Sequence, residues 1–541
     1  MTELHHATVF EAVADRLPGR SALRHGDRVV TWAEFDDDAS RLAAALLAHG
    51  IGREDSVGLF LYNGPEYLEA FFAALKIRAR AFNANYRYRG GELRQLLDNA
   101  QAKALVYSAA LRDRVATAVT DRPDLLLVEV GDDDSTPPIP GAHRLTDLLV
   151  EHEPAARIHR PGTDTYLTYT GGTTGVPKGV LIEVQRHLNT VMWLRDQYVG
   201  RALDGDIVDI VDVAVELADQ GESLDVIPAS PLMHGVGFTF SSIPGLVTGG
   251  VATTLTNRSF DPVELLTTIA ATRPKVVAIV GDAFSLPMVR ALDEAAEAGT
   301  TYDTSSVQVL CSAGVAWSAT IKQRLFEHLP HVALVDACGC TEGVTYGSRT
   351  IRKGDVLSTA NFVAAPGVMV LSPEGDRLPP GEIGMLAGPT QGNGYFRDPE
   401  ATAAVYLHID GVQCAIPGDL GRIEADGTVT LIGRGVTTIN TGGEKVYPTE
   451  VEDALRDLPE IDDCLVLAVP DERLGQRVAA LVVAAPDAVI DPADLTRRLR
   501  EQLAGYKVPS RILEIDQVPR GPNGKTDYAA ATTLVEGAVE A

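Results

Sequence analysis

The first third of the chain alternates short apolar runs with amphipathic helical runs, and this alternation limits the fold more than any other feature. Residues 56–61 read as a buried strand, and helical runs at 39–49 and 65–77 lie on either side of it in the sequence. Further strands are predicted at 104–107 and 125–130. Strands that alternate with helices in this way form parallel sheets covered by helices. We therefore expect an α/β architecture.

The pattern changes twice toward the carboxyl end. After Ala364, short strands broken by Pro, Gly and Asp turns predict a small all-β unit. From Pro448 onward the pattern changes again, to a compact α+β tail. A chain of 541 residues is also too long for one compact core. The predicted organisation is an N-terminal domain at 1–433, a hinge at 434–440 and a C-terminal domain at 441–541.

Composition and charge disfavour several classes of partner. The formal net charge of −27 would repel the phosphates of nucleic acids and anionic membranes. The five cysteines lack the spacings of a zinc site or a disulfide framework. We find no signal segment and no stretch long enough to cross a membrane. These features predict a cytoplasmic protein with no nucleic-acid partner and no stable membrane insertion. The acid-rich stretch 204–225 is interpreted as a solvated, partly helical insertion rather than a metal site.

The strongest functional signal is the segment 166–180, YLTYTGGTTGVPKGV. An apolar strand enters a loop rich in Gly and Thr, and a lysine closes the loop. Such a loop can direct backbone N–H groups and hydroxyls onto phosphate oxygens, and the lysine adds positive charge. It is not a Walker A loop, because Gly179 follows the lysine and the glycine spacing differs. The segment predicts a phosphate loop made of Thr170, Gly171, Gly172, Thr173, Thr174, Gly175 and Lys178.

This loop resembles the phosphate loop of the adenylate-forming superfamily, which comprises acyl-CoA synthetases, peptide-synthetase adenylation domains and luciferases. The family pattern T-S-G-[ST]-T-G-x-P-K-G is matched except at Gly171, and the resemblance continues in order over nearly the whole chain. It implies a large N-terminal domain of sheets and helices with a β-barrel-like part at 365–433, plus a small mobile α+β C-terminal domain. The implied activity is activation of a carboxylic acid by ATP through an acyl-adenylate.

Later motifs that match the family assign the catalytic and nucleotide-binding roles. In DACGCTEG, Thr341 would contact the phosphate or adenylate, and Glu342 would hold Mg²⁺. Asp419 would accept hydrogen bonds from both ribose hydroxyls, and Arg434 would help to hold the ribose and phosphate. Lys525, in RGPNGKTDY, would bridge the substrate carboxylate and the α-phosphate, because a flexible ammonium offsets the repulsion between two anions.

The adenine and acyl pockets are assigned by position in the same motifs. His234, in PLMHGVG, would lie beside the bound carboxylate or gate it. Many relatives hold adenine with an aromatic residue, but Cys338 stands there in this chain, so the manner of adenine binding is open. The other candidates along the nucleotide and acyl pockets are Ser312, Gly314, Val315, Gly339 and Cys340, with Gly281, Asp282 and Ala313 on the acyl side. Gly443 and Lys445 belong to a loop that would line the pantetheine tunnel.

The resemblance implies ATP, Mg²⁺ and coenzyme A as cofactors and a small-molecule carboxylic acid as substrate. In detail the chain is most similar to the branch of bulky-acyl, steroid side-chain and long-chain acyl-CoA ligases. An amide synthetase, a nitrite-activating diazotase acting on an aryl amine, and an adenylation module serving a carrier protein stay open as alternatives. A nucleotide-binding pseudoenzyme is disfavoured because Lys525, Glu342 and Asp419 are all present. The acid and the oligomeric state stay open, a homodimer included.

Overall fold

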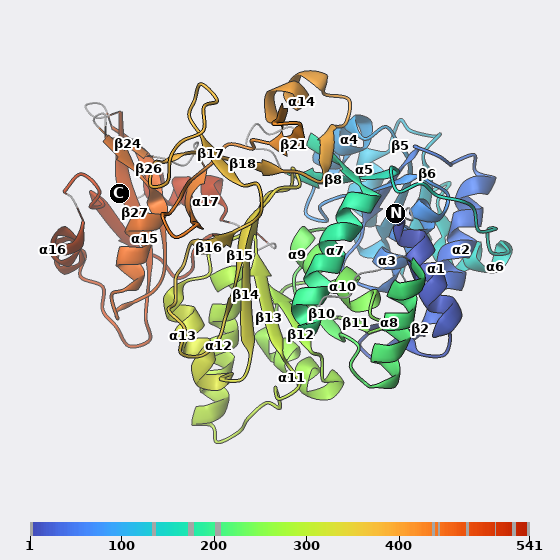
Figure 1. Ribbon diagram of the computed structural model, residues 1–541, viewed down its shortest axis with the longest axis horizontal. Coiled ribbons are helices and arrows are strands. Elements are labelled where there is room, and N and C mark those ends of the chain that lie inside the picture. Colours follow the sequence, from blue (N-terminus) through green and yellow to red (C-terminus); the bar gives the residue numbers. More distant parts are fainter. Residues whose placement is uncertain are drawn as a thin grey trace.

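The computed structural model describes residues 4–131, 137–170, 178–200, 207–434, 439–441, 444–471, 475–503, 505–521 and 526–537. These residues form three sheets with helices around them (Figure 1). The first sheet has the strand order β19-β9-β8-β4-β3-β5-β6-β7. Its strands are β3 (Ser56–Phe60), β4 (Arg80–Asn83), β5 (Ala102–Ser108), β6 (Leu126–Val130), β7 (His143–Arg144), β8 (Thr165–Thr170), β9 (Lys178–Glu183) and β19 (Gly392–Tyr395).

The predicted parallel arrangement is confirmed in this first sheet. Strands β8, β4, β3, β5, β6 and β7 run parallel, and β9 and β19 add an antiparallel edge. The predicted helix at 39–49 begins earlier in the structure, because Thr31 and Glu34 form a capping box ahead of it. The helices of this part of the chain are α1 (His6–Arg16), α2 (Trp32–Ala48), α3 (Pro65–Lys76), α4 (Gly90–Asn99), α5 (Arg112–Ala118) and α6 (Leu145–Glu151), with the short 3-10 turn η1 (Ala109–Leu111).

The second sheet has the order β2-β1-β11-β10-β12-β13-β14-β15-β16-β23-β22-β18-β21-β20, with β17 paired to β18. It is parallel from β1 to β14 and antiparallel from β15 onward. Its strands are β1 (Ser21–His25), β2 (Arg28–Thr31), β10 (Val226–Pro228), β11 (Ala252–Thr254), β12 (Val276–Ile279), β13 (Val309–Ala313), β14 (Ala333–Gly339), β15 (Thr345–Ile351), β16 (Asn361–Ala364), β17 (Met369–Leu371), β18 (Gly384–Pro389), β20 (Tyr406–Ile409), β21 (Val412–Ala415), β22 (Asp419–Ile423) and β23 (Thr428–Arg434).

Several helices lead into the strands of this second sheet or connect them. They are α7 (Val184–Val199), α8 (Ile207–Asp219), α9 (Gly235–Gly237), the π-helix η2 (Phe238–Ser242), α10 (Ile243–Leu246), α11 (Pro262–Thr272), α12 (Gly281–Glu297), α13 (Ala319–His328) and α14 (Pro399–Val405). The strand-rich segment after Ala364 did not predict α14. That helix begins at a proline, and the Asp398 side chain caps it by accepting a hydrogen bond from the Ala401 N–H at 2.9 Å.

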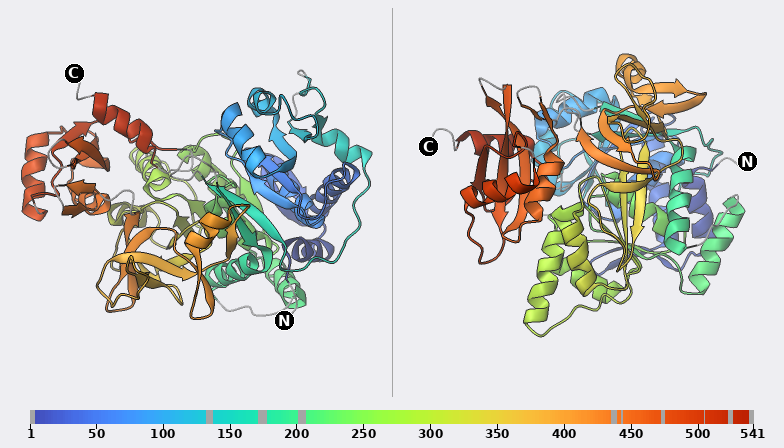
Figure 2. Two further views of the ribbon diagram at one scale, coloured as in Figure 1. Left: turned by 90° about the horizontal axis from the view of Figure 1, so that it is seen from above. Right: turned by 60° about the vertical axis from the view of Figure 1, so that its left-hand side comes forward.

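The C-terminal tail forms the third sheet, β25-β24-β27-β26 with β28 beside β27, and has its own core. Residues of β26 alternate between the two faces of this sheet, with Val466 in one cluster and Leu465 and Leu467 in the other. In Figures 1 and 2 this unit lies at the end of the molecule away from the blue N-terminal helices. Its elements are β24 (Ile439–Thr441), β25 (Glu444–Val446), α15 (Pro448–Arg456), β26 (Ile461–Asp471), β27 (Gly475–Ala484), α16 (Pro492–Gln502), β28 (Arg511–Glu514) and α17 (Tyr528–Gly537).

The acid-rich stretch contains the helix α8, and its character differs between two faces. One face packs against α1 and buries Ile210, Ala214 and Leu217. The other face carries acids, of which Asp212 pairs with Arg16 at 2.8 Å. Within the described ranges, no three His, Cys, Asp or Glu side chains converge as metal ligands. None of the helices in those ranges combines the length and apolar character that crossing a membrane requires.

Candidate active site

The phosphate-loop hairpin ends beside the Thr-Glu motif. Thr170 at the end of β8 pairs with Lys178 at the start of β9. The Lys178 ammonium lies 5.2 Å from the centre of the Tyr395 ring on β19, within the range of a cation–π contact. The predicted loop residues Gly171, Gly172, Thr173, Thr174 and Gly175 lie outside the described residues. The paired residues Thr170 and Lys178 therefore mark the two ends of that loop.

The Tyr395 ring continues this contact to the Thr-Glu motif. Its hydroxyl donates a hydrogen bond to Glu342 Oε1 at 2.8 Å. The second carboxylate oxygen, Oε2, is buried and accepts no hydrogen bond from any residue that the structure describes. A buried anionic oxygen of this kind fits a ligand of Mg²⁺, which prefers oxygen donors and takes its remaining ligands from water and phosphate. Lys178 and Glu342, 164 positions apart in sequence, thus contact the same tyrosine.

Asp419, at the start of β22, is oriented by a tyrosine hydroxyl. It is 7% exposed, and its Oδ2 accepts a hydrogen bond of 2.8 Å from the Tyr346 hydroxyl. Burial, together with the neighbouring Asp419 carboxylate, raises the pKa of Tyr346 well above its ordinary value, so the phenol stays a donor. Arg434 pairs with Asp419 across β22 and β23, which places the backbones of the two residues opposite each other. Two candidate nucleotide-binding residues are therefore neighbours in the sheet.

The two cysteines of DACGCTEG are neutral packing groups. Cys338 on β14 is buried, and burial raises its pKa and that of Cys340 well above the ordinary thiol value. Gly339 between them leaves no room for a side chain, since a Cβ would lie 2.6 Å from the Val344 carbonyl oxygen. Thr341 follows in the turn after the strand and is half-buried. The strand therefore presents small, uncharged groups at the position predicted to face adenine.

A second cluster of predicted residues gathers around the carboxyl ends of β12 and β13. The Ser312 hydroxyl accepts a hydrogen bond from the Gly281 N–H at 2.8 Å. Gly314 follows with a φ of +91°, a conformation that side chains rarely adopt. A Cβ at Gly314 would lie 3.9 Å from Val236, the second residue after His234. The segment after β13 thus faces the one that carries His234.

Asn83, at the carboxyl end of β4, ties the phosphate hairpin to the His234 segment. Its Nδ2 donates to the carbonyl oxygens of Tyr169 at 3.0 Å and Met233 at 2.9 Å. Its Oδ1 accepts from the Tyr169 N–H at 2.7 Å. The sequence prediction missed Asn83, although a polar residue at the end of a buried parallel strand is a usable signal. It also missed Tyr395 and Tyr346, for which the sequence offers no comparable signal.

Fewer of the candidate residues in the C-terminal unit lie among the described residues. Gly443 and Lys525 lie outside the described residues, and Lys445 is described only as part of the backbone of β25. The C-terminal unit contacts α12 through two ion pairs, Arg290 with Asp462 and Arg456 with Asp282 at 3.9 Å. Asp282, which was predicted on the acyl side, is thus engaged with the C-terminal unit, and its Oδ1 also accepts from a backbone N–H at 2.9 Å.

Comparison with known proteins identifies close counterparts over the whole chain. Models described as AMP-binding enzyme and AMP-binding enzyme C-terminal domain match residues 10–396 and 450–525. A medium/long-chain-fatty-acid–CoA/3-oxocholest-4-en-26-oate–CoA ligase of Mycobacterium tuberculosis is 36% identical over 98% of this chain and 96% of its own. A 3-oxocholest-4-en-26-oate–CoA ligase of Rhodococcus rhodochrous is 35% identical over 97% and 95%. The ATP-bound structure of MatB from Rhodopseudomonas palustris superposes with a TM-score of 0.80 at 26% identity, covering 98% and 99% of the two chains.

Proposed function

Because the chain belongs to the AMP-binding enzyme family and is an AMP-forming acid–CoA ligase, we propose that its acid is large and apolar: a long-chain fatty acid or the side-chain acid of a steroid. The named substrates of the relatives from Mycobacterium tuberculosis and Rhodococcus rhodochrous support this choice. We also propose Mg²⁺ as the metal, the residue roles given below and the cytoplasm as the place of action.

The assignment of the reacting centre rests on Tyr395, which contacts two of the candidate residues. Tyr395 joins the phosphate-loop lysine to the Glu342 carboxylate, with Lys178 over its ring and Glu342 on its hydroxyl. ATP triphosphate held by the loop would therefore lie against the buried Oε2 of Glu342. Mg²⁺ bound there would neutralise phosphate oxygens as pyrophosphate leaves. Asp419, oriented by Tyr346, would receive the ribose hydroxyls bidentately.

In the first half-reaction the substrate carboxylate attacks the α-phosphorus of ATP in line. A P–O bond to the acid forms as the bond to pyrophosphate breaks, and the products are the acyl-adenylate and pyrophosphate. Lys178 and Thr341 would stabilise charge on the phosphates, and Lys525 would bring the carboxylate and the α-phosphate together. His234 would lie beside the carboxylate during this attack.

In the second half-reaction the thiol of coenzyme A attacks the acyl carbon of the mixed anhydride and releases AMP. We propose that the C-terminal unit rotates between the two steps about residues 434–440, which moves Lys525 away and brings the loop with Gly443 and Lys445 to the thiol channel. The ion pairs of Arg290 and Arg456 with acids across the domain contact would have to break in that movement.

The test is a pyrophosphate-release assay over fatty, steroid side-chain and aryl acids, each with and without coenzyme A. We expect turnover that requires coenzyme A, that is highest with a long-chain or steroid side-chain acid, and that yields a thioester detectable by mass spectrometry. Highest turnover with a short or aryl acid would contradict the proposed acid. Nitrite with aryl amines is run in the same panel. Pyrophosphate release that depends on an amine would mean that the amine, and not coenzyme A, is the acceptor. Release that depends on nitrite would mean that nitrite, and not a carboxylic acid, is the activated substrate.

A further inference from the structure

We propose that His187 is a positioning residue that sets the shape of the acyl pocket by holding the π-helical turn η2 in place. The inference rests on the proposed function, in which His234 lies beside the acid. η2 follows His234 directly, and the Phe238 N–H donates to the His234 carbonyl oxygen at 3.1 Å. A Cβ at Gly235 would lie 4.0 Å from the Thr239 hydroxyl, so Thr239 is adjacent to the residue after His234.

The backbone of η2 needs outside support. A π-helix is rare and occurs mostly as a single turn, frequently at functional sites. Here the turn covers Phe238–Ser242 and is buried at Phe238, Ser241 and Ser242. Any side chain that favours this turn over an ordinary α-helical one also fixes where its residues point, and therefore the wall of the pocket that starts at His234.

His187 contacts two successive residues of this turn in two different ways. From α7, its Nε2 lies 2.9 Å from the Thr239 hydroxyl oxygen, a hydrogen bond. Its ring stacks on Phe238 with centroids 5.9 Å apart and an interplanar angle of 6°. Phe71 and Tyr166 pack edge-on against the same phenyl ring, at centroid distances of 4.7 and 6.5 Å. One imidazole thus contacts η2 through both a hydrogen bond and a ring stack.

His6 of α1 bonds the other ring nitrogen of His187. Its Nε2 lies 2.8 Å from His187 Nδ1. Burial lowers the pKa of His187 to about 3 and that of His6 well below its ordinary value, so both rings are neutral at physiological pH. A neutral imidazole donates once and accepts once. If His6 donates to His187, then His187 donates to Thr239, and the buried Nδ1 of His6, which has no partner among the described residues, is left as an acceptor.

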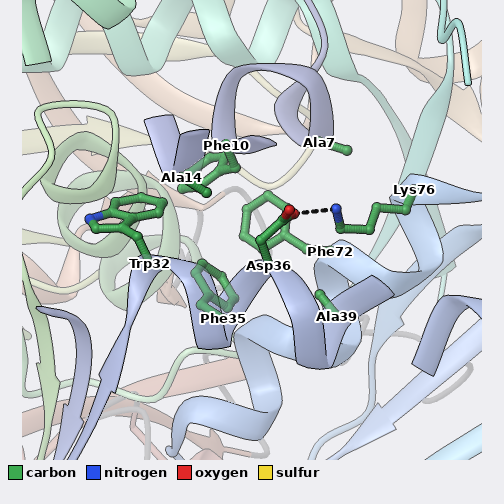
Figure 3. A pocket seen from close by; sticks show the side chains of 9 residues that line it. All are labelled: Ala7, Phe10, Ala14, Trp32, Phe35, Asp36, Ala39, Phe72 and Lys76. Carbon is green, nitrogen blue, oxygen red and sulfur yellow. Dashed lines mark hydrogen bonds and ion pairs between the residues drawn. The ribbon is translucent and has the colours of Figure 1, made fainter. Parts of the chain in front are cut away.

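His6 has little freedom to move, because α1 is also anchored further along the helix. Figure 3 shows Phe10 and Ala14 of α1 packed with Trp32, Phe35 and Phe72 around a cavity of about 10 Å³, room for at most one water molecule. Beside this cluster the Lys76 ammonium lies 2.8 Å from Glu11 of α1 and 2.5 Å from Asp36, and the Asp36 pair is drawn in Figure 3. The chain His6–His187–Thr239 therefore runs from a rigid helix to the acyl pocket.

A positioning role differs from a purely structural one in which kinetic constant changes. His187 touches neither the phosphate-loop lysine nor Glu342 in any contact that the structure gives, whereas it touches Phe238 and Thr239 directly. Loss of its hydrogen bond should therefore raise the KM for the acid, most for the largest acids, and leave the KM for ATP and coenzyme A unchanged.

The experiment compares T239V, T239S, H187N and H187Q with the wild-type enzyme. Valine keeps the shape of threonine without the hydroxyl, and serine keeps the hydroxyl. Glutamine places an amide near the Nε2 position that bonds Thr239, and asparagine places one near the Nδ1 position that bonds His6. N189A, on the exposed face of α7, is the control. KM is measured for a short fatty, a long fatty and a steroid side-chain acid, and for ATP and coenzyme A, together with Tm.

We expect T239V and H187N to raise the KM for the larger acids five- to ten-fold, with T239S and H187Q recovering most of the loss. Equal changes in all three substrates' KM, or a lower Tm with unchanged KM in every variant, would overturn the proposal. Should the wild-type enzyme prefer a different acid, the proposed function fails, while the same variants tested with that acid by pyrophosphate exchange still decide the role of His187.

Discussion

The two proposed ends of the candidate site, one for the nucleotide and one for the acyl group, are built from different chemistry. At the nucleotide end, tyrosine hydroxyls hold carboxylates, Tyr395 on Glu342 and Tyr346 on Asp419. At the acyl end, the neutral imidazole of His187 bonds the Thr239 hydroxyl and stacks on the Phe238 ring. The difference follows from the substrates, since ATP brings charge that must be matched, whereas a large apolar acid would gain nothing from a charged wall. Mutations at the two ends should therefore affect different substrates.

The largest effect should follow K525A, because Lys525 is assigned to both ends at once. We expect pyrophosphate release from ATP and acid to fall about 10³-fold, since an ammonium no longer offsets the repulsion between carboxylate and α-phosphate. Thioester formation from pre-formed adenylate should be spared. The two half-reactions are measured separately, by pyrophosphate release and by thioester yield. Equal loss of both steps would contradict the bridging role and show a general defect.

E342Q should break the nucleotide end alone. Glutamine can still accept the Tyr395 hydrogen bond through its amide oxygen, but it removes the charge from the buried oxygen that we assign to Mg²⁺. We expect about 100-fold slower adenylation and a higher Mg²⁺ concentration for half-maximal rate. The matched control is Y395F, which removes the hydroxyl and keeps the carboxylate. An unchanged Mg²⁺ requirement in E342Q would assign the metal to other ligands.

Y346F should have a smaller effect at the same end. The phenol donates one hydrogen bond to Asp419, and losing it should let the carboxylate turn away from the ribose. A hydrogen bond of this kind contributes about 1 kcal/mol, which corresponds to about a five-fold rise in the KM for ATP. The KM for the acid should not change in Y346F, whereas T239V should raise the KM for the acid and leave the KM for ATP unchanged. Y346F and T239V therefore give the sharpest comparison between the two ends. A rise in both constants would mean that the two ends are coupled through β14 and β15.

The sequence supplied more candidates for the proposed nucleotide end than for the proposed acyl end. Glu342 and Asp419 stand in contiguous motifs, and the alternation of strands and helices predicted the parallel sheet that carries the phosphate hairpin. The partners of these residues lie far away in the chain, as Tyr395 does from Glu342, so only the tertiary fold brings them together. His187 could not be predicted, because its role depends on how α7 is rotated against η2 and on α1. A histidine on an amphipathic helix is ordinarily a packing residue.

The smallest predicted effect concerns the buried histidines of the acyl end. The pKa of His187 is about 3 in the folded protein and near 6.5 in the unfolded chain. Between these values the unfolded chain binds the proton, so stability rises with pH in that window and falls as pH drops through 6.5. Going from pH 7 to pH 6, His187 should cost about 0.7 kcal/mol of unfolding free energy.

H187Q, which cannot titrate, should therefore lose about 0.7 kcal/mol less than the wild-type protein over the same pH step. Urea unfolding of both proteins at pH 7 and pH 6 measures this difference, with N189A as the matched control. His5 and His6 also have lowered pKa values, through burial first, so a pH dependence should persist in H187Q and only its slope should fall. An identical loss in the two proteins would mean that His187 is already hydrated or protonated near neutral pH, and the neutral relay to Thr239 would fail with it.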